Sequence, residues 1–442
     1  MLLRFSVENF RSFRQEAEFS FVATRITDSP THVFPASTPE VDHGVLPALA
    51  VYGANASGKS NGLRALAVLR NEVKDSFSER KPGDRIAGYK PFLLGTSDEA
   101  RPTTWTIDFL VEGVRYHYGL SINATEVVEE WLDAYPERRR QQWFHRTVDA
   151  SAERPTFYFG PGLKGRRQAI ADFTRPNATF LSAAAQNAHE QLTPVYTWFS
   201  ESIRISSGLQ GRGVPRFSRQ EPIAQEGLRS LFQKLLREAD VGIEDFRIVD
   251  DEREVHTARQ VIASPDLPDE GRTSFARFER ELLDNPPVYP ELLHRGEGGK
   301  PRALDLDDES HGTKMLLLQT NHALSVLSGG GLLVVDEIDA SLHTRLAERL
   351  IGLFTDPQSN PNGAQLLFAS HNPALLDSLR RDEVVFTEKG RDGGSTVVPL
   401  SDYNTRKRLD TGRAYREGRL GGVPVLGDLA AVVADELHRG DR

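Results

Sequence analysis

The chain has 442 residues, of which 38% are hydrophobic and 26% charged, and this ordinary globular usage excludes disordered and fibrous classes. It has no cysteine, which excludes thiolate zinc sites, disulfides and thiol catalysis. No apolar run reaches the length of a membrane span, so we expect a cytoplasmic protein without a membrane partner. A net charge of −9 argues against coating nucleic acid by charge alone.

The first third of the chain predicts sheet, then a glycine loop, then helix. Apolar residues alternate over 2–10 and 16–21, which predicts a pair of strands, and 26–45 has the composition of a loop. The short apolar strand 46–53 enters the loop, and helical apolar spacing follows over 63–73.

Further along, two strands over 105–111 and 114–120, joined by the turn Glu112-Gly113, predict a hairpin and hence an antiparallel sheet. Residues 165–295 favour a mostly helical insertion. Basic runs at 137–146 and 164–167 are interpreted as solvated surface or as a contact with nucleic acid or an acidic partner.

The α/β pattern returns near residue 303. A helix capped by Ser310 stops at three glycines. After it we expect strand 332–337, helix 342–354, strand 364–370 and a helix after Pro373. We therefore predict an α/β nucleotide fold split into 1–165 and 301–442, with a helical insertion at 166–300.

The segment 53–61, "GANASGKSN", has the spacing of a phosphate-cradling loop. In such a loop backbone N–H groups face the phosphates, Lys59 reaches the β and γ oxygens, and the Ser60 hydroxyl holds Mg²⁺. The alternative is a chance cluster of small residues in an ordinary turn.

A second motif supports the first. The buried strand "LLVV" ends in Asp336 and Glu337, which suit Mg²⁺ binding through water and polarisation of the attacking water. The next such strand ends before His371, which suits sensing of the γ-phosphate. The alternatives are a strand that merely ends in a polar turn and an inert histidine.

Ser310 and Gly312 start a predicted helix and form an anion site. The glycine loop already surrounds the nucleotide of its own molecule, so we expect this second site to close over the nucleotide of another copy. Dimerisation would then depend on ATP. A simple serine N-cap is the alternative.

The order of these motifs resembles the ABC-type ATPase heads of the RecF and SMC kind, and more closely the compact AAA-family ATPases of bacterial abortive-infection and anti-phage systems. Matching pieces also include "FSVENFRSF", "YKPF", "DEIDASLH" and "AYREGRLGGVPVL". The resemblance covers about 1–130 and 300–427. It implies a split ABC-type P-loop ATPase head with a mixed sheet, an antiparallel β subdomain and a mostly helical insertion.

The resemblance also implies roles for individual residues. Glu337, Asp336 and His371 are the expected catalytic residues, and Ser60 and Asp336 the expected Mg²⁺ ligands. Arg11 is expected near the nucleotide, and Asp339, Ser341 and His343 along the dimer seam. The residues expected to contact ATP are Gly53, Asn55, Ser57, Gly58, Lys59, Ser60 and Asn61, with Ser310, Gly312 and Thr313 reaching the partner's γ-phosphate.

Two departures from the family matter. The signature is Ser-His-Gly-Thr, without the longer glycine-glutamine form of transporters, and no glutamine occurs between Asn61 and Arg140, where the metal-sensing glutamine loop is expected. Slow turnover is therefore expected. The acidic runs 251–256 and 304–309 are interpreted as solvated turns, which leaves no second active site.

The resemblance suggests the ATPase subunit of an anti-phage system, a homodimer or higher oligomer that controls a separate nuclease or toxin. A RecF-like ATPase acting on DNA in repair or recombination is the main alternative. Two further alternatives are the motor of a membrane transporter and a scaffold with a purely structural ATP site.

Overall fold

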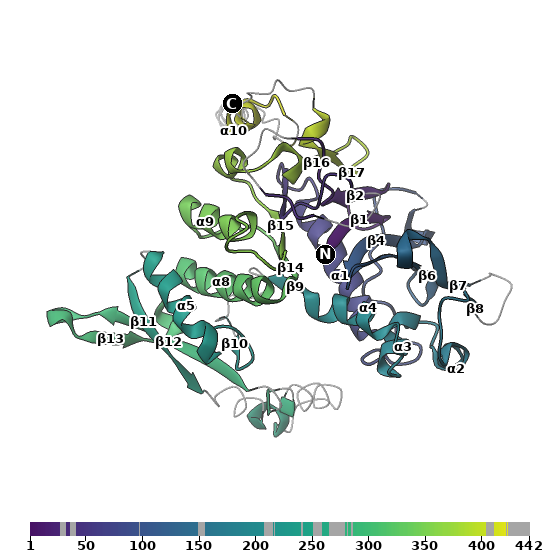
Figure 1. Ribbon diagram of the computed structural model, residues 1–442, viewed down its shortest axis with the longest axis horizontal. Coiled ribbons are helices and arrows are strands. Elements are labelled where there is room, and N and C mark those ends of the chain that lie inside the picture. The colour runs from purple at the N-terminus through teal and green to yellow at the C-terminus, as the bar shows by residue number, and fades with distance from the viewer. Residues whose placement is uncertain are drawn as a thin grey trace, which may run out of the picture. The chain divides into compact units, whose positions relative to one another are not determined.

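The computed structural model describes residues 1–26, 32–35, 41–96, 98–148, 155–206, 215, 217–239, 242–250, 259–264, 279–280, 282–283, 286–403, 411–420 and 422. The chain divides into two compact units. Residues Leu2–Ser200 and Ala369–Arg442 form the terminal unit, and Met1 with Glu201–Phe368 forms the central unit. Each is described by itself below, with the element labels of Figure 1.

The terminal unit contains an antiparallel sheet of seven strands in the order β2-β1-β4-β5-β6-β7-β8. The predicted strand pair is confirmed, since Phe5 of β1 lies opposite Phe19 of β2. The predicted hairpin is also confirmed, and its turn residues Glu112 and Gly113 have φ of 49° and 79°. The strands are β1 (Leu2–Glu8), β2 (Ala17–Ser20), β4 (Thr103–Val111), β5 (Val114–Ile122), β6 (Val127–Tyr135), β7 (Gln141–Thr147) and β8 (Thr156–Phe159).

A second set of strands in this unit carries the glycine loop. The buried strand β3 (Ala48–Gly53) pairs in parallel with β16 (Val384–Lys389), which pairs antiparallel with β17 (Ser395–Pro399). Helix α1 (Lys59–Asp75) follows the loop as predicted. A Cβ built on Gly62 would lie 2.4 Å from the Phe19 ring, so this glycine allows α1 to pack closely on β2.

Short helices complete the terminal unit. They are α2 (Arg167–Phe173), α3 (Phe180–Gln186), α4 (Thr193–Thr197) and α10 (Thr411–Arg416), with a π-helical turn at Trp198–Ser202 and 3₁₀ turns at Asp98–Ala100, Pro136–Arg138, Pro373–Ser378, Arg381–Glu383 and Leu400–Asp402. The helix predicted after Pro373 is thus a 3₁₀ turn, and the helical prediction for the segment after residue 177 is confirmed by α3 and α4.

In the central unit, β14 (Leu332–Val335) lies between β15 (Gln365–Ala369) and β9 (Ile203–Ser206), parallel to both. All four residues of β14 are buried and apolar, as expected for a parallel strand covered on both faces. The long helix α8 (His311–Gly329) precedes β14, and α9 (Thr344–Thr355) follows it. Gly330 ends α8 in the left-handed conformation, which confirms the predicted glycine stop.

The central unit also contains an antiparallel sheet that the helical prediction for 166–300 did not include. Strand β12 (Pro287–Arg295) pairs with β10 (Phe217–Ser218), β11 (Ile243–Asp250) and β13 (Pro301–Leu304). Helices α5 (Glu226–Glu238) and α8 lie beside this sheet (Figure 1). One apolar core joins them through Phe232 of α5, Leu292 of β12 and Leu317 of α8.

The charged runs of the sequence differ in how far they are exposed to solvent. The basic run 137–146 is only partly solvated, because Arg146 at its end is completely buried and donates to the backbone oxygens of Ala178 and Pro176. The run 304–309 contains a 3₁₀ turn with exposed Asp307 and Asp308, as expected, whereas 251–256 lies outside the described residues.

Candidate nucleotide-binding site

The glycine loop is a tight turn held by its own lysine. Lys59 is buried, and its Nζ donates to the backbone oxygens of Gly53 at 2.8 Å and Ala54 at 3.0 Å. Gly53 and Gly58 have φ of 155° and 120°, within the range that favours glycine. A Cβ on Gly53 would lie 2.4 Å from Thr387 Oγ1, so both conformation and space require glycine there.

Helix α1 begins at this loop without a side-chain cap. Its N-cap is Gly58, which has no side chain to accept a hydrogen bond from the first turn. The first N–H groups of a helix need an external acceptor, and the helix dipole favours an anion there. An uncapped helix of 17 residues that follows a glycine loop is therefore suited to a phosphate group.

Residues from distant segments support the loop. Ser57 Oγ and Thr387 Oγ1 are 2.6 Å apart, and Asn61 Nδ2 donates to Ser12 Oγ at 2.9 Å. Ser57 is buried, whereas Asn55 is exposed. Sequence reasoning missed Ser12 and Thr387, because each lies far along the chain from the loop and no local pattern marks the contact.

Arg11 lies in the turn beside Ser12 and is exposed. Partial burial of its guanidinium and the charge of Arg64 on α1 lower the pKa of Arg11. Two cations therefore lie close enough to interact beside the N-terminal part of α1. Their field favours an anion, which agrees with the expected position of Arg11 near the nucleotide.

The turn that carries His371 lies next to β3. Ser370 N donates to Val51 O at 3.2 Å, two residues before the glycine loop, and Tyr52 Oη donates to Asn372 O at 3.0 Å. His371 itself is exposed. The structure therefore brings this segment beside the strand that enters the glycine loop.

The acidic pair lies in the central unit directly after β14. Asp336 and Glu337 are partly exposed, and Glu337 has a φ of 54°. Left-handed backbone is costly for residues other than glycine and concentrates at functional sites. Ser341 in the same loop has a φ of 63°, and the buried Asp339 Oδ1 has no hydrogen-bond partner.

The signature helix begins beside that loop. Ser310 is exposed and caps α8, with its Oγ accepting from Thr313 N at 3.1 Å. A Cβ on Gly312 would lie 2.6 Å from Ser341 O, so the helix start and the predicted seam are in close contact. His343 caps α9, its Nδ1 accepting from Arg345 N at 3.3 Å.

The described end of the chain also packs near the glycine loop, a contact that the sequence did not predict. Tyr415 Oη donates to Gly422 O at 3.2 Å, and a Cβ on Gly422 would lie 2.9 Å from Gly53 Cα. The Tyr415 ring stacks on Phe386 of β16 with centroids 5.6 Å apart. The "AYREGRLGG" motif thus contacts the strands that support the loop.

The oxygens available for Mg²⁺ are hydroxyl and carboxylate groups. Among the described residues no three His, Asp or Glu side chains gather as a metal site. Mg²⁺ usually binds one or two protein oxygens together with phosphate oxygens and water. Ser60 in the terminal unit and Asp336 in the central unit are each half-buried oxygen donors of this kind, so the chemistry of each one fits Mg²⁺ binding.

Comparison with known proteins places the chain. A family model described as "AAA domain, putative AbiEii toxin, Type IV TA system" matches residues 49–377, well over half of the sequence. The chain belongs to this family. It is an AAA-type ATPase domain related to the AbiEii family, and the mixed α/β fold predicted from the sequence is confirmed. No curated protein matches this AAA-family chain.

Solved structures were compared as well. The SMC head domain from Thermotoga maritima matches with 15% identity and a TM-score of 0.34, over 90% of this chain and 98% of that one. The Smc head domain with a coiled coil and joint derived from Pyrococcus yayanosii matches with 12% identity and a TM-score of 0.37, over 95% of this chain and 99% of that one.

Among the described residues of the AAA-family chain, no helix is both long and apolar enough to cross a membrane.

Proposed function

We propose that this AAA-type chain binds and hydrolyses ATP with Mg²⁺, slowly, as the ATPase subunit of a bacterial anti-phage system of the abortive-infection kind. The observation that carries the proposal is the uncapped start of α1 behind a glycine loop whose lysine is already folded inward. The family description, which names a putative AbiEii toxin and a type IV TA system, supports the biological role.

The residues act in distinct roles in this proposal. Lys59 and the N–H groups of the glycine loop hold the triphosphate, and Arg11 adds positive charge beside it. Glu337 accepts a proton from the attacking water, and His371 donates to the γ-phosphate. Ser60 and Asp336 would hold Mg²⁺, which would neutralise charge on the phosphates.

Dimerisation around ATP completes the proposed site. Ser310 is exposed at the start of α8. Ser341 and His343 are also exposed, and they follow the acidic pair within a few residues of the chain. The close contact between Gly312 and Ser341 supports a common surface for the proposed signature and seam residues. A second copy presents this surface to the nucleotide, and the ATP-closed dimer controls a separate nuclease or toxin in the cytoplasm.

ATP binding and turnover test the proposal. We expect Lys59→Ala to weaken ATP binding by about 100-fold, because a buried charged partner of the phosphates is lost. Glu337→Gln should keep binding and lower turnover by about 100-fold or more. The matched control is Lys74→Ala in the last turn of the same helix, which should change neither. Unchanged ATP binding in Lys59→Ala would contradict the proposal.

The biological role is tested separately. The Glu337→Gln variant, expressed in the native host with ATP retained, should co-purify with a non-homologous effector. Affinity for DNA that falls steeply with salt, without such a partner, would instead support the repair alternative.

A further inference from the structure

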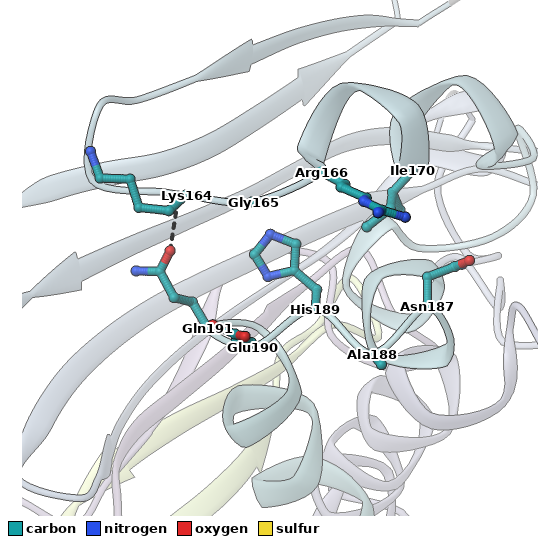
Figure 2. A pocket seen from close by; sticks show the side chains of 9 residues that line it. All are labelled: Lys164, Gly165, Arg166, Ile170, Asn187, Ala188, His189, Glu190 and Gln191. Carbon is teal, nitrogen blue, oxygen red and sulfur yellow. Dashed lines mark hydrogen bonds between the residues drawn. The ribbon is translucent and has the colours of Figure 1, made fainter.

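A pocket in the terminal unit includes part of the basic run 164–167 and none of the residues assigned above to nucleotide binding. It is formed by two loops, one before α2 and one after α3, which face each other in Figure 2. Its volume is about 510 Å³, within the usual range for small-molecule sites. The lining residues are Lys164, Gly165, Arg166, Ile170, Asn187, Ala188, His189, Glu190 and Gln191.

His189 is the unusual member of this pocket. It is only 6% exposed, and neither ring nitrogen makes a hydrogen bond of good geometry, although backbone groups of Lys164 and of His189 itself lie close enough to act on the ring. Buried polar atoms in native proteins nearly always have a partner, so an unpaired imidazole in a pocket wall indicates a missing one. Burial lowers the pKa of His189, so the neutral ring offers one donor and one acceptor.

The loop above the imidazole is shaped to leave room for it. Gly165 has a φ of 87°, and a Cβ there would lie 3.3 Å from His189 Nε2. Gln191 fixes the same loop, because its Oε1 accepts from Lys164 N at 2.6 Å and its Nε2 donates to Gly162 O at 3.1 Å. The pocket is therefore held open by hydrogen bonds that do not use His189.

Lys164 and Arg166 both bring positive charge to the pocket lining, and the Glu190 carboxylate brings one negative charge close to His189. The Arg166 side chain is exposed and makes no hydrogen bond or ion pair with the described part of the chain, and in Figure 2 it lies on the Ile170 side of the His189 ring. The Lys164 side chain instead points away from His189, with its Nζ bound to Pro161 O at 2.6 Å. The next arginine, Arg167, is also engaged, since it donates to Gly160 O and Leu163 O.

We propose that this pocket binds a free nucleoside 5′-monophosphate. The phosphate bonds to the Arg166 guanidinium and to the donor nitrogen of His189. The volume far exceeds that of a phosphate ion, and Ile170 and Ala188 provide apolar surface for a sugar and base. Asn187 Nδ2 already donates to Ala183 O at 2.8 Å, which leaves its Oδ1 to accept from the base.

The test is calorimetric titration of the full chain with AMP, GMP, CMP and UMP, with ribose 5-phosphate and inorganic phosphate as comparison ligands. At least one nucleotide should bind with a Kd below about 1 mM. Arg166→Ala, an exposed change that leaves the fold intact, should weaken binding about 10-fold or more. His189→Gln should weaken it as well, and Arg139→Ala, which removes an exposed charge elsewhere in this unit, should not.

The pocket uses no residue of the glycine loop, so this inference does not rest on the proposed ATPase function. The titration is repeated in Lys59→Ala, where monophosphate binding should persist; its loss would place the ligand at the glycine loop and overturn the proposal. The proposal is also wrong if none of the four nucleotides binds, if Arg166→Ala behaves like Arg139→Ala, or if inorganic phosphate binds as tightly as the nucleotides.

Discussion

Glu383 is a buried carboxyl group whose surroundings favour its neutral form. Its Oε2 accepts from Arg380 N at 2.7 Å, while its Oε1 has no partner. Arg380 is already paired with Asp382, at 2.9 Å. Burial is the main cause that raises the pKa of Glu383 to about 8.

This shift predicts a pH-dependent stability. The folded pKa of about 8 exceeds the ordinary value of 4.5. The neutral Glu383 carboxyl therefore stabilises the folded state fully below pH 4.5, and this contribution is lost as the pH rises to 8. Glu383→Gln should remove a slope of up to about 1.4 kcal/mol per pH unit from the free energy of unfolding over this range. Urea unfolding at pH 5.5, 6.5 and 7.5 measures it. Identical slopes in Glu383→Gln and the exposed control Glu137→Gln would show that Glu383 is ionised in the folded protein.

Residue spacing alone predicted the role of Lys59, whereas residue identity was a poor guide where burial decides. Arg146 ends a basic run that is expected to be solvated, because arginine is rarely fully buried. In the structure it lies 3.9 Å from the equally buried Glu130, whose carboxylate accepts from Phe180 N and Leu181 N. Only the packing of α3 against β6 and β7 brings these partners together.

At the scale of elements, the start of α8 has two separable roles. Ser310 caps the helix through its Oγ, and the same exposed hydroxyl is proposed to reach the partner's triphosphate. Ser310→Ala should lower the free energy of unfolding by about 1 kcal/mol, because Thr313 N loses its acceptor. Ser310→Asn should restore most of that stability, since asparagine caps equally well.

Both variants should lose ATP-dependent dimerisation if the hydroxyl contacts the partner. Urea unfolding and size-exclusion chromatography with ATP measure the two effects independently. Unchanged stability in Ser310→Ala would contradict the capping role, and a normal dimer in both variants would contradict the contact with ATP.

Strands and helices at the two ends of the chain were predictable because their periodicity is local. The four buried apolar residues of β14 and the alternation in β4 and β5 each indicate a strand without outside information. The sheet around β12 was missed. Its strand β10 has two residues, and the β11–β12 pairing joins segments separated by a long intervening stretch. Such pairing leaves little trace in local sequence.

For the whole molecule, the proposed mechanism predicts a change of mass with nucleotide. Glu337→Gln should be a dimer with Mg²⁺ and ATP and a monomer with ADP, because only the triphosphate spans both copies. Light scattering after size exclusion measures this mass. Glu112→Gln, which removes a carboxylate from an exposed turn, should not stabilise the ATP dimer. A Glu337→Gln protein of constant mass would exclude dimerisation around ATP.

The sequence alone predicted the class of chemistry, because a glycine loop, an acidic strand end and a capped helix are recognised by spacing within a few residues. It also indicated the α/β fold and the AAA family. Tertiary structure decided what depends on distant segments. Examples are the contacts of Ser12 and Thr387 with the glycine loop, the packing of Gly312 on Ser341, and the pocket around His189. These contacts depend on how separate elements pack, and no short stretch of sequence records that packing.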